Sequence, residues 1–204
     1  TMTAKIKLNA ASGGGSFSLQ APSSSSNNRV MTLPDTADGT ILTTTNPKSG
    51  NIIQVVSTTK TDTFSSNSDS FTDLTGLSVT ITPTSTSSKI LFTATICFGM
   101  SADGYGSGRL VRDSTPLGVA PADGNRPVCG FAMQMNLNAN NKLYTLTYQY
   151  LDSPNTTSAT TYKLQARTYT GDSRTFTINR TQLDTNLEYL HRGESRVIAM
   201  EVAG

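Results

Sequence analysis

Short segments in which apolar and polar residues alternate are the feature that most restricts the fold of this sequence. In the segment LSVTIT, Leu77, Val79 and Ile81 occupy every second position, and Ser or Thr fills the positions between them. A period of two places alternate side chains on opposite faces of an extended chain, so this segment predicts a strand with one buried face. Residues 88–98 alternate in the same way but carry Leu91 and Cys97 on the second face, which predicts a strand covered on both sides.

We predict a series of further strands between residue 50 and the C-terminus, some of which show the same period. These lie at residues 51–60, 109–112, 128–135, 143–151, 161–168, 174–179, 185–191 and 195–202. Turn-forming pairs such as Asp103-Gly104, Asp123-Gly124 and Asn140-Asn141 separate them. No window of the sequence has the period of an amphipathic helix.

Many short strands separated by turns predict an all-β fold built from antiparallel sheets. The number of strands fits a β-sandwich of the jelly-roll kind, which has about eight strands in two sheets. An immunoglobulin-like sandwich, which needs about seven strands, is the alternative. The inward positions of the strands predict a core that contains Leu77, Val79, Ile81, Ile90, Phe92, Ile96, Phe98, Leu146, Tyr162, Leu164, Phe176 and Ile178.

The sequence predicts two parts with a boundary near residue 47. The stretch TTTNPKS around the boundary is polar, and Pro47 is excluded from a central strand. Residues 48–204 form the predicted sandwich. Residues 1–47 hold only short predicted strands, at 4–8, 16–21, 29–33 and 40–43. Because isolated hairpins of this size are marginally stable in water, we expect the first part to be an attachment segment that is completed by copies of itself or by another protein.

Composition excludes two classes of partner. The formal net charge is only +2 and 15% of the residues are charged, without the clustered Lys and Arg that nucleic-acid binding requires. The longest apolar stretches are far too short to cross a bilayer. We therefore expect neither nucleic-acid binding nor membrane insertion.

The sequence offers few residues for catalysis or metal binding. His191 is the only histidine, and no G-x-S-x-G segment is present to place a nucleophilic serine. The segment Gly104-Tyr-Gly-Ser-Gly108 resembles a phosphate-binding loop, but a strand follows it where a helix would be needed, so we interpret it as a flexible hairpin tip. Asp62, Asp69 and Asp73 do not have the spacing of a calcium loop. We therefore expect no catalytic residue, no cofactor and no bound metal, and a protein that is not an enzyme.

The two cysteines, Cys97 and Cys129, do not form a disulfide framework. Both lie in apolar segments, which favours two buried free thiols, because free cysteine is among the most buried residue types. One disulfide between neighbouring strands is the alternative.

Two groups of segments resemble bacteriophage virion proteins. SFSLQAPSSSSNNRVMTLPDTADGTILTTT, at residues 16–45, resembles a segment that recurs in phage tail-fibre and related virion proteins. The shared features are a strand that ends before Ala-Pro, a polar turn, Thr-Leu-Pro-Asp and Asp-Gly-Thr-Ile-Leu. The rest of the chain resembles fibre-like proteins of marine and cyanobacterial phages. That resemblance lies in GNIIQVV (50–56), FTDLTGLSV (71–79), SSKIL (87–91), RLVRD (109–113), INR (178–180) and ME (200–201).

This resemblance implies a structural protein of the virion that assembles in the host bacterial cytoplasm. It implies a homotrimer whose β head binds the host surface, either a polysaccharide or a protein, while the N-terminal part contacts other virion proteins. A capsid decoration protein that stabilises the head shell is the alternative, because the chain has no long shaft or coiled coil. A polysaccharide depolymerase is a third hypothesis.

Two residues in turn-rich connections are the candidates for contact with the receptor. Residues 100–108 and 115–127 are the longest such connections, and we expect them at one end of the sandwich. Tyr105 offers a rigid amphipathic surface, and Arg126 offers a planar set of hydrogen-bond donors. The alternative is that both connections are merely solvated or pack where subunits of the trimer meet.

Overall fold

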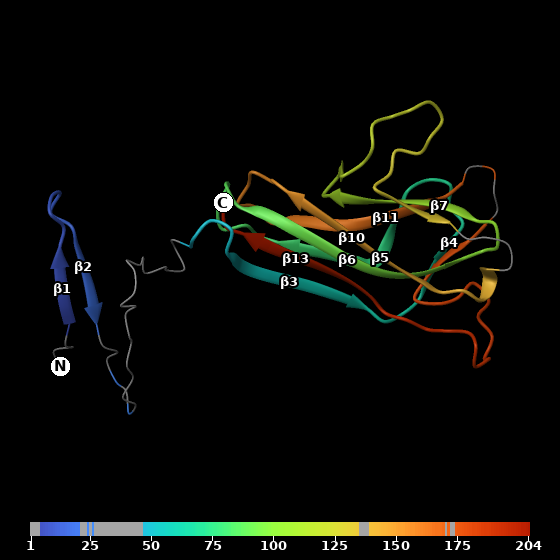
Figure 1. Cartoon of the computed structure of the whole chain (residues 1–204), viewed down its shortest axis with the longest axis horizontal. Coiled ribbons are helices and arrows are strands. Elements are labelled where there is room, and N and C mark those ends of the chain that lie inside the picture. The colour runs from blue at the N-terminus through green and yellow to red at the C-terminus, as the bar shows by residue number, and fades with distance from the viewer. Residues whose placement is uncertain are drawn as a thin grey trace, which may run out of the picture. The chain divides into compact units, whose positions relative to one another are not determined.

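The computed structural model describes residues 5–20, 47–134, 139–169, 171 and 174–204, together with the single residues 24 and 26. The chain divides into two compact units, Thr1–Ile41 and Leu42–Gly204 (Figure 1). The strands predicted at 29–33 and 40–43 lie outside the described residues. The boundary predicted at residue 47, and the roles of the two parts, stay predictions.

The first unit contains an antiparallel hairpin of β1 (Lys5–Asn9) and β2 (Ser16–Gln20), close to the strands predicted at 4–8 and 16–21. Ile6 pairs with Leu19, so these two residues and Leu8 share one face of the hairpin. Their side chains are 65%, 40% and 59% exposed, respectively. One face of this hairpin is therefore apolar and open.

The second unit is a sandwich of two antiparallel sheets. In the described residues, the first sheet has six strands: β3 (Ile52–Lys60), β4 (Phe64–Ser66), β6 (Lys89–Met100), β10 (Tyr144–Asp152), β12 (Phe176–Ile178) and β13 (Ser195–Val202). The second sheet has five strands there: β5 (Thr72–Ile81), β7 (Tyr105–Arg112), β8 (Thr115–Leu117), β9 (Phe131–Gln134) and β11 (Thr160–Thr168). The one short helix in the described residues is the 3₁₀ turn η1 (Ala139–Asn141).

The strand order is that of a jelly roll. Strands β8 and β9 pair with successive parts of β7, and β13 and β12 pair with successive parts of β6, so each pair occupies one position in its sheet. With these combined, β3 pairs with β13, β5 with β11, β6 with β10, and β7 with β8 and β9. The second unit thus pairs its first strand, β3, with its last, β13, and continues inward, as a folded-over antiparallel ribbon does. This confirms the predicted all-β jelly-roll sandwich.

The space between the sheets is filled by the residues that the alternation assigned to it. The large side chains Phe92, Tyr162 and Phe176 are fully buried, and the other predicted core residues are also buried, with one exception. Leu146 is only half-buried and packs against the edge of the core. At about 1.5–3 kcal/mol for each large apolar side chain removed from water, this core is the main source of stability of the sandwich.

A buried carboxylate joins the two sheets. Asp152 of β10 accepts hydrogen bonds from the Arg112 guanidinium of β7 at 2.7 and 2.9 Å, and from the Tyr162 hydroxyl of β11 at 2.6 Å. The Asp152 side chain is only 6% exposed. Burial, reinforced by this hydrogen bond to Asp152, raises the pKa of Tyr162 well above its usual range.

The strand predicted at residues 185–191 is wrong. This segment forms consecutive turns, with hydrogen bonds from Leu187 N to Thr185 O and from Leu190 N to Leu187 O. Leu187 and Tyr189 are 45% and 56% exposed, so the alternation of apolar residues here does not mark a buried face. Local turn hydrogen bonds satisfy the backbone groups that a neighbouring strand would otherwise have to satisfy.

The interpretation of residues 104–108 as a flexible hairpin tip is also wrong, and so is the long loop expected at 100–108. Strand β6 runs to Met100 and β7 begins at Tyr105, which leaves only a tight turn between them. Gly106 and Gly108 lie on the inward face of β7. A Cβ atom at Gly108 would lie 2.1 Å from the Phe131 ring. The glycines are therefore present so that large core side chains pack against the backbone of β7.

Both cysteines are free and half-buried. The prediction of free thiols is confirmed and the disulfide alternative is wrong, but neither thiol is fully buried. Cys97 lies on the outer face of β6, where its sulfur is 3.5 Å from the Thr145 hydroxyl. In the described ranges, no helix has the length and apolar character needed to cross a membrane.

Candidate functional site

Two tyrosines lie side by side on the outer surface of the second sheet. The Tyr169 amide donates to the Tyr105 carbonyl at 3.0 Å, which continues the β7–β11 ladder one position beyond Gly106 and Thr168. Because Gly106 and Thr168 are buried and side chains alternate, both tyrosines point outward. They are 53% and 59% exposed. The sheet thus presents two adjacent aromatic rings to solvent.

These tyrosines line an open hollow of about 850 Å³, which we call the tyrosine groove. Its other side chains come from the turn before β7, from β7 and β9, from the loop before β9 and from the segment after β11. The residues used below are Asp103, Tyr105, Ser107, Arg126, Cys129, Tyr169 and Arg174. The two candidate residues from the sequence, Tyr105 and Arg126, therefore lie on the same hollow.

The loop between β8 and β9 forms one wall of the tyrosine groove. Residues 118–130 leave the sandwich as the yellow-green loop of Figure 1. The base of this loop is closed by the Ala120 amide, which donates to the Cys129 carbonyl at 3.2 Å, and by Gly130, which donates to Gly108 at 2.9 Å. In the long connection predicted at 115–127, the first three residues form β8 at the sheet edge, and the residues from 118 onward form the loop.

Arg126 forms an ion pair with Asp123, three residues earlier in the same loop. The Arg126 and Asp123 side chains are 81% and 68% exposed. A pair this exposed contributes little to stability, so the guanidinium is able to exchange its partner for a ligand. Across the groove, the Arg174 guanidinium donates to the Ala102 carbonyl.

A cationic surface continues from the tyrosine groove along the outer face of the sheet. The Arg109 guanidinium lies 4.0 Å from the centre of the Phe71 ring, and that of Arg167 lies 5.8 Å from it. Arg109 also donates to Gln165 at 2.9 Å. Burial lowers the pKa of Arg109. These contacts hold two positive charges next to the groove in fixed positions.

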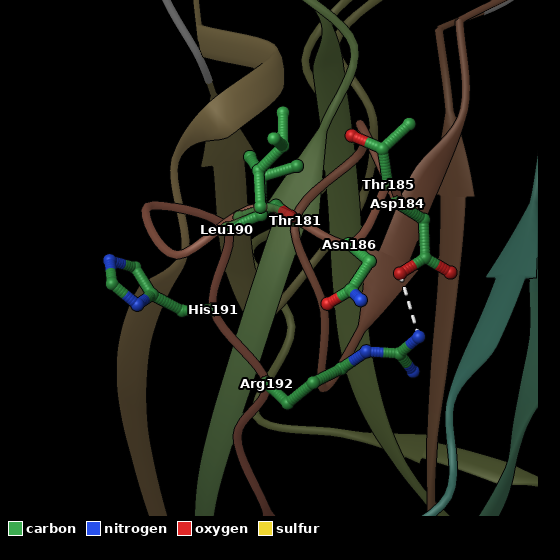
Figure 2. A pocket seen from close by; sticks show the side chains of 8 residues that line it. Thr181, Asp184, Thr185, Asn186, Leu190, His191 and Arg192 are labelled. Atoms are coloured by element: carbon green, nitrogen blue, oxygen red, sulfur yellow. Dashed lines mark hydrogen bonds and ion pairs between the residues drawn. The ribbon is translucent and has the colours of Figure 1, made fainter.

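A second, smaller hollow of about 250 Å³ lies within the loop 181–192 (Figure 2). Its polar lining includes Thr181, Asp184, Asn186 and His191. Figure 2 shows the His191 ring pointing away from the carboxylate of Asp184. In the part of the chain that the structure describes, the His191 ring makes no hydrogen bond, and no three His, Cys, Asp or Glu side chains gather in one place.

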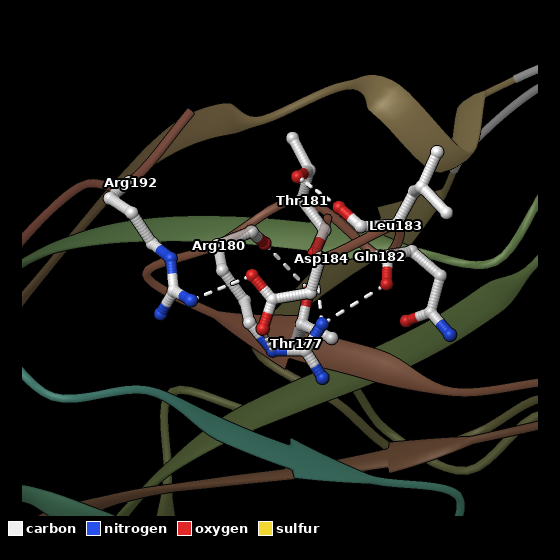
Figure 3. A network of polar contacts seen from close by, with 7 residues as sticks. All are labelled: Thr177, Arg180, Thr181, Gln182, Leu183, Asp184 and Arg192. Atoms are coloured by element: carbon white, nitrogen blue, oxygen red, sulfur yellow. Dashed lines mark hydrogen bonds and ion pairs between the residues drawn. The ribbon is translucent and has the colours of Figure 1, made fainter. Parts of the chain in front are cut away.

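The charges of this second hollow hold the loop together (Figure 3). Asp184 accepts a hydrogen bond from Arg192 at 2.7 Å and lies 3.7 Å from Arg180. Arg180 in turn donates to the carbonyls of Thr181 and Gln182, both at 3.0 Å. Because these groups already bond one another, we interpret them as supports of the loop rather than as ligand-binding groups.

The sequence analysis proposed Tyr105 and Arg126, which both line the tyrosine groove, but did not propose Tyr169 and Arg174, which line it as well. Tyr169 enters the groove only because β7 pairs with β11, a contact between residues 64 positions apart in the chain. One signal was present: the outward positions of β11 are Lys163, Gln165 and Arg167, and a tyrosine then follows at the next outward position.

The solved structures to which this chain is similar include distant neighbours of low sequence identity. No family model matches the chain, and no curated protein matches it. Similar solved structures include that of the infectious bursal disease virus Gx strain, with 15% identity and a TM-score of 0.38 over 94% of this chain and 46% of that one. A mutant VP2 protein of the same virus in T=1 particles has 14% identity and a TM-score of 0.37, over 93% and 46% of the two chains. This chain thus spans less than half the length of these neighbours, and the jelly-roll assignment rests on the strand order.

Proposed function

We propose that this chain is a structural protein of a bacteriophage virion whose jelly-roll head is presented on the particle and binds the host surface. The tyrosine groove is the observation that carries the proposal, because exposed aromatic and arginine side chains around a hollow are typical of recognition surfaces. The tail-fibre-like segments at residues 16–45 support the virion part of the proposal. In this role the protein acts by binding and is not an enzyme.

Recognition is assigned to Tyr105 and Arg126 on the tyrosine groove. The sandwich holds the strands rigid, while the loop that carries Arg126 extends into solvent. Binding residues are commonly found on loops that a rigid scaffold positions. The groove therefore combines a fixed wall, formed by the second sheet, with an adaptable one.

The homotrimer is part of the same proposal, and two apolar surfaces support it. On the outer face of the first sheet, Val55, Met200, Leu91 and Leu151 are successive cross-strand partners, which we call the apolar row. Val55 and Leu151 are 58% and 51% exposed. Monomeric proteins rarely expose large contiguous apolar patches, so a surface of this kind favours contact between copies. The open apolar face of the β1–β2 hairpin supports a role of residues 1–47 in trimerisation or attachment.

Locating the protein in intact particles tests the proposal. Gold-labelled antibody raised against the purified chain should decorate the tail or another projecting structure, in a small number of copies. Labelling spread over the head shell, with loss of shell stability when the protein is removed, would instead identify a decoration protein. Absence from purified particles would overturn the virion role.

A further inference from the structure

The tyrosine groove has exposed aromatic side chains of the kind that stack on sugar rings. Tyr105 and Tyr169 are cross-strand neighbours on the ladder and both are more than half exposed, so each offers an apolar ring face and a polar hydroxyl end to solvent. An aromatic ring of this kind accommodates the apolar face of a pyranose while its hydroxyl bonds to polar neighbours. The hollow of about 850 Å³ is in the range of ligand sites, which is roughly 300–1,000 Å³.

The charges around the groove favour an anionic ligand. Arg126 and Arg174 line the hollow, and Arg109 and Arg167 lie beside it on the same sheet. Of the acidic side chains near these arginines, Asp103 lines the hollow, Asp123 pairs with Arg126, and Asp73 accepts a hydrogen bond from Gln165, which itself accepts one from Arg109. A guanidinium is able to match a carboxylate with two parallel hydrogen bonds. Arg126 already donates to one carboxylate, that of Asp123, through a single contact.

From these two observations we propose that the groove binds an acidic saccharide, a sugar polymer whose units carry carboxylates. The rings of Tyr105 and Tyr169 stack on the sugar, Arg126 exchanges Asp123 for a sugar carboxylate, and the Ser107 hydroxyl bonds to sugar hydroxyls. This inference rests on the proposed host-surface function and names the chemistry that the groove recognises.

Calorimetric titration of the purified 204-residue chain tests the inference. The probes are oligosaccharides of galacturonate and of glucuronate, with neutral oligosaccharides of galactose and of glucose of the same length as matched ligands. We expect binding of at least one acidic probe, weaker binding of its neutral counterpart, and an affinity that falls as salt is raised. Tyr105→Ala and Tyr169→Ala should each weaken binding at least about ten-fold.

Two further variants separate stacking from charge. Arg126→Gln should reduce the difference in affinity between the acidic and the neutral probes, while the affinity for the neutral probes stays unchanged. Tyr189→Ala is the matched control, because Tyr189 is 56% exposed but lies in the loop of the second hollow, so this variant should bind like the wild type. Circular dichroism of each variant confirms that the sandwich is folded.

The inference is overturned if no acidic probe binds at millimolar concentration, if neutral probes bind equally well, or if the tyrosine variants bind normally. Adsorption of the same protein to host cells is measured in parallel. Cell binding without saccharide binding, as for a protein receptor, would refute the acidic saccharide and leave the host-surface function standing. Saccharide binding without cell binding would refute that function instead.

Discussion

At the scale of single residues, Asp152 has a small side chain whose removal should strongly lower the stability of the sandwich. Asp152→Ala leaves the Tyr162 hydroxyl without its acceptor and removes the partner of Arg112. Breaking a buried ion pair from one side costs about 3–5 kcal/mol, and we expect the lower end because the Arg112 side chain is 25% exposed. Urea unfolding should show this loss at an unchanged m-value. Asp152→Asn keeps an acceptor oxygen and should lose less, and equal losses for the two variants would contradict this account.

Tyr162 gives the same network a dependence on pH. Its pKa is raised by burial and by the hydrogen bond to Asp152, so the folded protein keeps this proton where an unfolded tyrosine, with a pKa of about 10, loses it. Above that pH the folded state binds more protons than the unfolded state, so the free energy of unfolding falls as pH rises. In Tyr162→Phe, the free energy of unfolding should fall less steeply between about pH 10 and 11. The slopes of the two proteins should differ by up to about 1.4 kcal/mol per pH unit. If the free energies of unfolding of the wild type and of Tyr162→Phe fall in parallel as pH rises, this effect is refuted.

At the scale of elements, β7 depends on its inward glycines. Gly108→Ala places a Cβ atom 2.1 Å from the Phe131 ring, so the ring must move, and overpacking of this kind costs about 1–3 kcal/mol. Thermal unfolding should show the loss. Gly15→Ala is the control, since a Cβ atom there meets nothing within 4 Å. A Gly108→Ala variant as stable as the wild type would show that β9 adapts without cost.

The same elements show how far the sequence leads. Strand β13 was predicted at its observed bounds, residues 195–202, although its residues do not alternate in polarity and four apolar residues follow one another at 197–200. Strand β8 was not predicted, because Pro116 is typical of a turn. Proline is accepted in this strand because β8 lies at the edge of the sheet. Strand β7 was truncated because glycines carry no apolar signal, although Gly106 and Gly108 face the core. Tyr169 of the tyrosine groove was missed for another reason. It lies next to Tyr105 only because β7 pairs with β11, and local sequence patterns do not encode such long-range pairing.

At the scale of the whole molecule, self-association is the property to measure first. We expect light scattering at micromolar concentration to give three times the chain mass of 21.7 kDa. Leu151→Lys places a charge in the apolar row and should shift the protein toward the monomer, because burying an unpaired charge is costly. Ser78→Lys, at an exposed position on the other sheet, should leave the mass unchanged. A monomeric wild-type protein would contradict the trimer.

The central claim, that the head binds the host surface, is tested most directly by competition for adsorption. Purified protein is added to host cells before the phage, and the rate of phage adsorption is measured. The account predicts that the wild-type protein slows adsorption in proportion to its concentration, whereas the folded double variant Tyr105→Ala, Arg126→Ala does not. Unchanged adsorption at saturating wild-type protein would contradict the claim.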